Sequence, residues 1–158
     1  MERRQLLKAA GLGAALSQYA SVHRGAGHLS QLTTARYEAA RDTVRRFVRA
    51  RADDAVVFTR NTTDAINLAA RATPGDVVVL DIEHHANLLP WCTPVDGRCR
   101  ARIVRACATI EDTLVALEAE LASAPASLLA VTAASNVTGE VLPISKLASI
   151  AHRHGARI

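Results

Sequence analysis

The sequence has few aromatic residues, few lysines and no long apolar run. Aromatic side chains make up 3% of the 158 residues, so a core must be built from Ala, Val, Leu and Ile. The 49% hydrophobic content is that of a globular protein and argues against disorder. A chain of this length can bury about 70% of its unfolded surface in one domain. Because no run reaches the ~18 apolar residues of a membrane span, the sequence predicts none.

Cysteine and histidine patterns exclude further classes. Cys92, Cys99 and Cys107 form an odd set without Cys-x-x-Cys spacing, which argues against a zinc ribbon or a disulfide scaffold. The same pattern favours a reducing compartment, so we expect a cytoplasmic protein. His84 and His85 are adjacent, and neighbouring side chains of an extended segment point in opposite directions. They make a poor metal pair, and no metal site is predicted.

The net charge of +4 is compatible with an anionic ligand but does not indicate nucleic acid. The arginines between positions 41 and 51 lie on a predicted helix and are most simply its solvated face. No aromatic interleaving or nucleic-acid motif accompanies them, so no nucleic-acid partner is predicted.

The N-terminal 18 residues have two interpretations. A charged segment at 2–8, with Arg3 and Arg4, precedes an apolar stretch at 9–16, as in a twin-arginine export signal. The alternative is an amphipathic helix over residues 1–18 that leads directly into the domain. Because no Ala-x-Ala cleavage site precedes Tyr19, we favour the helix and keep export as the alternative location.

Helical periodicities and short apolar runs alternate along the remainder of the chain. The predicted helices cover 31–50, 62–71, 110–124 and 144–154, the last closed by Gly155; the predicted strands cover 55–59, 77–80, 101–104 and 128–132, with the start of another at 157–158. Strands alternating with helices imply a mostly parallel sheet covered on both faces. The predicted fold class is therefore a three-layer α/β/α arrangement.

Three polar segments follow predicted strands: 61–67, 83–91 and 135–139. In open α/β sheets ligands bind at the carboxyl ends of the strands, so we expect the three segments to form one site. At the first segment, a helix N-terminus and the hydroxyls of Thr62 and Thr63 would suit a phosphate. Ordinary helix capping by Thr62 or Thr63 is the simpler alternative there.

The other two segments carry side chains suited to an aromatic ligand and a carboxylate. The imidazole of His84 could stack on a ring and move protons. The amide of Asn136 offers donors and an acceptor for a ring oxygen or a substrate carboxylate. Taken singly, each residue is more often an ordinary loop residue.

Together, Asn-Thr-Thr at 61–63, Glu-His-His-Ala-Asn with Pro-Trp at 83–91, and Ser-Asn-Val-Thr-Gly at 135–139 resemble the class V aminotransferase family, whose best-known branch is the cysteine desulfurases. The match runs from about Tyr19 to Ile158. The resemblance implies a fold type I enzyme that uses pyridoxal 5′-phosphate (PLP), with 19–158 as a partial large domain. The family usually has Gly where this chain has Asn61, and Asn tolerates left-handed backbone geometry better than most residues.

The resemblance also implies residue roles. Asn61, Thr62 and Thr63 would bind the cofactor phosphate. His84 would lie over the cofactor ring as a cofactor-binding and catalytic residue, and Asn136 would contact the ring region and the substrate carboxylate. Residues 22–30 resemble an N-terminal loop near the family's active site, in which Arg24 is assigned to substrate binding. The intact family enzyme is expected to be a homodimer acting on a small amino acid.

Several family features lie beyond the position that matches Ile158: the Asp at the pyridine nitrogen, the Schiff-base lysine, the desulfurase cysteine and the carboxylate-binding Arg. This chain has only Lys8 and Lys146. The prediction is thus a truncated large domain that is inactive alone. The rival is a non-catalytic protein, truncated, decayed or serving as a partner-binding module. Desulfurase, aminotransferase, selenocysteine lyase and epimerase-like activities are not separated by these residues.

Overall fold

The computed structural model describes residues 16–23, 25–93 and 99–158. Contacts divide the chain into two compact units, one ending at Phe58 and one running from Thr59 to Ile158. The twin-arginine segment, Lys8 and Arg24 lie outside the described residues, so the predictions for them stay predictions. None of the helices in the described ranges combines the length and the apolar character needed to cross a bilayer.

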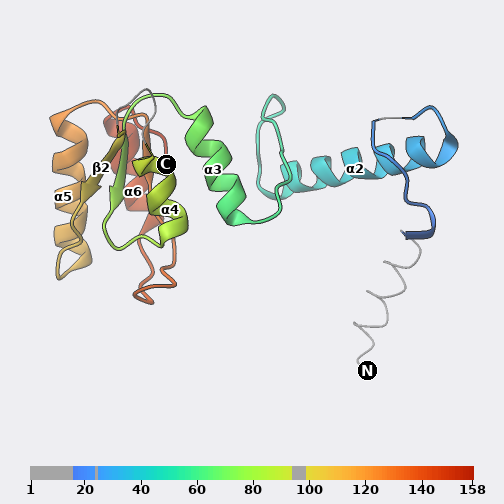
Figure 1. Cartoon of the computed structure of the whole chain (residues 1–158). Coiled ribbons are helices and arrows are strands. Elements are labelled where there is room, and N and C mark those ends of the chain that lie inside the picture. Colours follow the sequence, from blue (N-terminus) through green and yellow to red (C-terminus); the bar gives the residue numbers. More distant parts are fainter. Residues whose placement is uncertain (1–15, 24, 94–98) are drawn as a thin grey trace. The chain divides into compact units, whose positions relative to one another are not determined.

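The first unit contains helix α2, which spans His28–Phe47 (Figure 1). Sequence periodicity placed this helix three residues too late at both ends. The helix ends early because Arg49 adopts a left-handed φ of 53°. The Arg49 N–H then donates to the Arg46 carbonyl and the Ala50 N–H to the Arg45 carbonyl, which is the Schellman pattern.

The strand predicted at 55–59 is wrong. These residues have no regular secondary structure, and Val57 and Phe58 remain exposed. A β-strand requires a neighbouring strand to pair its backbone groups. No described residue provides such a neighbour, and the segment instead places Phe58 edge-on against the Tyr37 ring at 5.4 Å.

The second unit is built on a parallel sheet with strand order β2-β1-β3. The strands are β1 (Val77–Leu80), β2 (Ala101–Val104) and β3 (Leu128–Ala130). β1 lies in the centre and all four of its residues are buried, as its continuous apolar run predicted. The bounds of β1 and β2 agree with the prediction, and β3 ends two residues earlier than expected.

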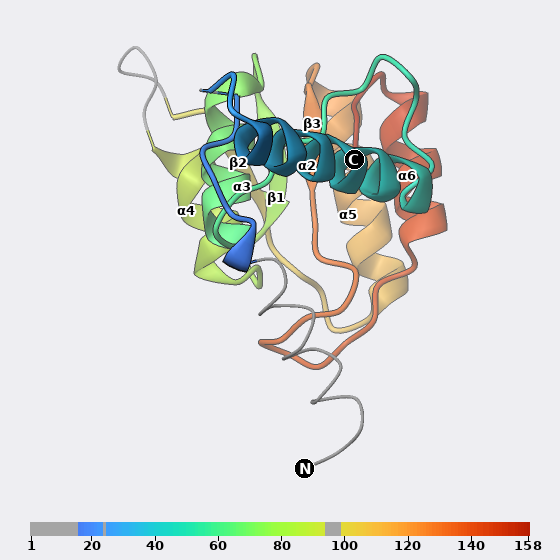
Figure 2. The ribbon, with the colours of Figure 1, turned by 90° about the vertical axis from the view of Figure 1, so that its right-hand side faces the viewer.

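Helices cover both faces of this sheet (Figure 2). Helices α3 (Thr62–Ala72) and α4 (His85–Cys92) bury Ala70 and Trp91 against Val77. Helices α5 (Ile110–Ser123) and α6 (Ile144–Arg153) bury Leu117 and Leu147 in the larger cluster on the other face, which includes Val78. The side chains of β1 thus alternate between the two faces. The predicted three-layer α/β/α arrangement is confirmed in this unit.

Helix α6 ends at a glycine, as predicted. Gly155 has φ 73°, and its N–H donates to the His152 carbonyl while the Ala156 N–H donates to the Ala151 carbonyl. Both bonds belong to the Schellman pattern that favours glycine at this position. The chain then forms an isolated parallel bridge between Arg157 and Leu128, so the start of a strand expected there is present as one bridge.

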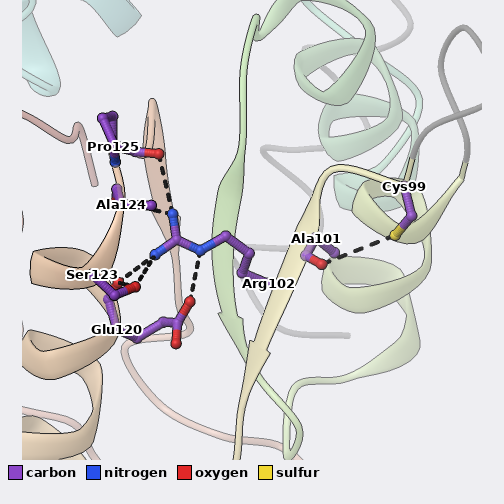
Figure 3. Close-up of polar contacts among 7 residues, drawn as sticks. All are labelled: Cys99, Ala101, Arg102, Glu120, Ser123, Ala124 and Pro125. Carbon is purple, nitrogen blue, oxygen red and sulfur yellow. Dashed lines mark hydrogen bonds and ion pairs between the residues drawn. The ribbon is translucent and has the colours of Figure 1, made fainter.

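Helix α5 has no basic residue in its last turn, and its C-terminus is capped from the sheet (Figure 3). The guanidinium of Arg102, on β2, donates to the carbonyl oxygens of Glu120, Ala124 and Pro125. Its Nε donates to the Glu120 carboxylate at 2.6 Å. One strand residue therefore satisfies carbonyls that a helix end leaves without partners.

Candidate functional site

The first site segment begins α3, and its cap differs from the prediction. Asn61, rather than Thr62 or Thr63, is the N-cap: its side-chain oxygen accepts from the Asp64 N–H at 2.9 Å. The backbone of Asn61 is extended, with φ −164°, so the left-handed tolerance of asparagine is not used. The amide side chain reaches the third N–H of the helix, which is the bond that favours Asn at this position.

This cap leaves polar groups of the next two residues available. Among the described residues, neither the backbone N–H nor the hydroxyl of Thr62 and Thr63 has a protein hydrogen-bond partner. The one acidic residue of this turn, Asp64, is paired with Arg60 at 2.6 Å. Hydrogen bonding to Arg60 lowers the pKa of Asp64. The turn thus presents four unpaired donors at the positive end of a helix dipole, a setting that favours an anion.

The second segment was interpreted as a loop, but most of it is helix α4. Pro90 lies inside the helix, at its sixth residue, where it removes one internal hydrogen bond. His84 is the N-cap, and its Nδ1 accepts from the Ala86 N–H at 3.1 Å. A ring nitrogen that accepts a hydrogen bond carries no proton, so the neutral ring has its proton on Nε2. The role of His84 as a cap fixes both the orientation of the ring and its tautomer.

Glu83 is a site residue that the sequence analysis did not identify. Its side chain is buried, with 4% of the residue exposed, although it lies directly between β1 and α4. One carboxylate oxygen accepts from the Thr132 N–H at 2.7 Å, and the other accepts from Asn87 Nδ2 at 2.9 Å. The Asn87 oxygen in turn accepts from the Trp91 indole N–H at 3.2 Å. A charged residue three positions after a fully apolar strand, and directly before His84, was the signal that could have indicated it.

The third segment is a tight turn held by Ser135. The Ser135 hydroxyl, which is buried, accepts from the N–H groups of Val137 and Thr138 at 3.1 and 3.0 Å. Gly139 closes the turn with φ 79°, and its N–H donates to the Ser135 carbonyl. Asn136 is exposed at the start of this turn, and in the described part of the chain its side-chain amide has no hydrogen-bond partner.

The three segments meet at one pocket of about 570 Å³. Thr62, Thr63, His84 and Asn136 all line it, together with Glu83 and the residues that follow β3. Asn61 is not a lining residue and acts through its cap. His85 does not line this pocket and faces a neighbouring hollow with Leu89 and Pro90. The structure thus brings the predicted residues together, while their individual roles stay predictions.

The described lysine is not at this pocket. Lys146 lies on α6 and lines a separate groove with Glu118 of α5 and Arg153. The residues of the pocket itself fit the phosphate and ring of PLP in kind, since unpaired donors stand beside an imidazole and an amide. No lysine amine is present among the lining residues to bind the cofactor covalently.

Comparisons with known proteins identify relatives of this chain. Residues 9–158 match the sequence model of the family described as Aminotransferase class-V. A probable cysteine desulfurase of Mycolicibacterium paratuberculosis is 39% identical over 148 residues, which cover 87% of this chain and 21% of that protein.

Two solved structures also resemble the fold. The apo cysteine desulfurase of Thermococcus onnurineus NA1 superimposes with a TM-score of 0.71 at 33% identity, covering 89% of this chain and 36% of that one. The cysteine desulfurase CsdA of Escherichia coli gives a TM-score of 0.67 at 34% identity, covering 99% of this chain and 41% of that one. The chain therefore spans between about a fifth and two fifths of the length of these relatives.

Proposed function

Since the chain belongs to the class V aminotransferase family, we propose that its pocket is part of a PLP site of the cysteine desulfurase type, acting on a small amino acid. The observation that carries the proposal is the convergence of Thr62, Thr63, His84 and Asn136 on one pocket beyond the ends of β1 and β3. When bound, the cofactor would supply an electron sink for carbanion chemistry at the amino acid.

The donors of α3 would hold the phosphate. The unpaired N–H groups and hydroxyls of Thr62 and Thr63 can donate to phosphate oxygens, and the helix dipole favours their negative charge. Asn61 contributes by capping the same turn, because its bond to Asp64 keeps the helix start in place. The family resemblance and the unpaired donors of this turn together favour phosphate binding over ordinary helix capping.

His84 and Asn136 would position the ring and the substrate. The hydrogen bond from Ala86 to His84 Nδ1 leaves Nε2 as the nitrogen that can donate a proton toward the pocket. The free amide of Asn136 can donate to a ring oxygen or to a substrate carboxylate. Arg24 stays a proposal for the substrate carboxylate. By the same resemblance we propose a cytoplasmic homodimer for the intact enzyme.

A second function is a non-catalytic module that keeps the sheet and part of the pocket. The position of Lys146 on α6, in a groove other than the pocket, favours this alternative for the chain alone. Covalent catalysis of the family type needs a lysine amine in the pocket. We therefore expect no amino-acid turnover by the purified chain with added PLP. Borohydride treatment followed by mass spectrometry should find no stoichiometric lysine adduct, and an adduct on Lys146 would contradict this expectation.

The experiment that tests the site is a PLP titration followed by the fluorescence of Trp91, the chain's single tryptophan. Without a covalent link we expect a dissociation constant of about 1 mM, or roughly 4 kcal/mol of binding. Thr62→Ala and Thr63→Ala should each weaken binding about threefold to tenfold, since each removes one solvent-accessible hydrogen bond with a net contribution of about 0.5–1.5 kcal/mol. Inorganic phosphate should compete.

Thr73→Ala is the matched control, because its hydroxyl bonds to the Ala69 carbonyl at the opposite end of the same helix. Equal binding by all four proteins, or binding that phosphate does not affect, would reduce the segment to a helix cap.

A further inference from the structure

Glu83 is a buried carboxylate for which the proposed chemistry has no use. An ionisable group with 4% exposure is costly to bury unless its oxygens are hydrogen-bonded, and here both are. Its two partners belong to different walls of the pocket. Thr132 follows β3, and Asn87 lies in the first turn of α4, next to His84.

We propose that Glu83 is a positioning residue of this pocket. Its two carboxylate oxygens hold the chain after β3 and the first turn of α4 at a fixed spacing, and this spacing sets the distance between the His84 wall and the wall that leads to Asn136. The expected effect on PLP binding rests on the proposed function. The hydrogen bonds that set the spacing are independent of that function.

The direction of each hydrogen bond explains why a carboxylate stands at this position. The Trp91 indole N–H can only donate, so it requires the Asn87 oxygen. The Asn87 NH₂ group therefore faces Glu83 and requires an acceptor there. The Thr132 N–H requires a second acceptor. Position 83 must present two acceptors, which a carboxylate does and an amide does not.

This logic predicts the effect of an isosteric change. In Glu83→Gln one of the two positions becomes an NH₂ group that faces a donor, so either Thr132 or Asn87 loses its partner. If the Asn87 amide rotates to accept from Gln, its NH₂ group then opposes the indole N–H of Trp91. The substitution thus removes one hydrogen bond of the network that joins Thr132, residue 83, Asn87 and Trp91, whichever way the amides turn.

The same logic supplies a rescue. In the double variant Glu83→Gln/Asn87→Asp, the carboxylate at 87 accepts from Trp91 with one oxygen and from the Gln NH₂ group with the other. The Gln oxygen remains for the Thr132 N–H. All three hydrogen bonds are thus restored, and the negative charge lies on residue 87 instead of residue 83. The single variant Asn87→Asp instead places two carboxylates face to face, which is unfavourable.

The test measures amide hydrogen exchange at Thr132, Trp91 emission and PLP affinity on the full chain. Glu83→Gln should weaken PLP binding about threefold to tenfold. It should also either accelerate exchange at Thr132 about tenfold relative to Val78 or shift Trp91 emission, depending on which hydrogen bond is lost. Glu111→Gln, the same change at an exposed carboxylate, should leave all three unchanged. The double variant should recover all three, even where Glu83→Gln alone fails to fold.

The outcomes separate this inference from the proposed function. Wild-type exchange at Thr132 together with wild-type Trp91 emission in Glu83→Gln, or a double variant no better than the single ones, would overturn the positioning role. If the wild-type chain fails to bind PLP while Thr132 and Trp91 respond as described, the cofactor assignment fails and Glu83 retains its role. Recovery of the hydrogen bonds in the double variant without recovery of PLP affinity would show that Glu83 acts through its charge, which contradicts the proposal.

Discussion

Removing the guanidinium of Arg102 should destabilise the second unit more than a single substitution on an edge strand usually does. The Arg102 side chain is 17% exposed, and its paired Glu120 is 35% exposed. Arg102→Met keeps the aliphatic stem but removes the ion pair and the donors to three carbonyls at the end of α5. Loss of one partner of a well-buried pair costs 3–5 kcal/mol, and solvent access at Glu120 reduces this, so we expect about 2–3 kcal/mol.

The assay is urea denaturation followed by far-UV circular dichroism, with Arg105→Met as the matched control. Arg105 is exposed just past the same strand, and its side chain has no hydrogen bond within the described residues. Its replacement should change the unfolding free energy by no more than about 0.5 kcal/mol. Arg102→Lys should lose part of the stability, because an ammonium cannot reproduce the planar fork. Equal losses in Arg102→Met and Arg105→Met would refute the capping role.

Three further predictions concern other parts of the chain. Arg49→Gly should stabilise the first unit by about 0.5–1 kcal/mol in thermal unfolding, because glycine adopts the left-handed φ of 53° without steric cost; a loss of stability would contradict this. Nitrogen-15 NMR should find the neutral His84 ring protonated on Nε2, since Nδ1 accepts from Ala86, and the opposite tautomer would contradict the cap. The hydrogen bond from Arg153 lowers the pKa of Glu118 below its usual 4.5, so this pair stabilises the α5–α6 contact above pH 4.5 and loses that effect as the pH falls through the lowered value. Arg153→Met should flatten the acid dependence of stability in this range, and an unchanged profile would contradict the assignment.

Much of the second unit could be predicted from local patterns because those patterns coincide with the burial that the fold requires. Val77–Leu80 is a continuous apolar run, and it became the central strand with both faces covered. Gly155 marks a helix end because only a residue tolerant of positive φ suits that position. In each case one short-range property was sufficient.

The failures depend on interactions between distant residues. Residues 55–59 have strand-forming side chains, but a strand also needs a partner, which no local pattern supplies. The segment after β1 was interpreted as a loop because it follows a strand, yet the His84 cap and the burial of Trp91 stabilise a helix there. Glu83 was missed because its role depends on a hydrogen bond from Thr132, which is 49 positions away in the chain.

The most direct test of the central claim is a map of backbone amide chemical shifts on addition of PLP to the full chain. The proposed site predicts that the largest changes occur at Thr62, Thr63, His84 and Asn136, which line one pocket from three separate segments. Changes centred on Lys146 and α6, or no changes at Thr62 and Thr63 at PLP concentrations well above about 1 mM, would contradict it.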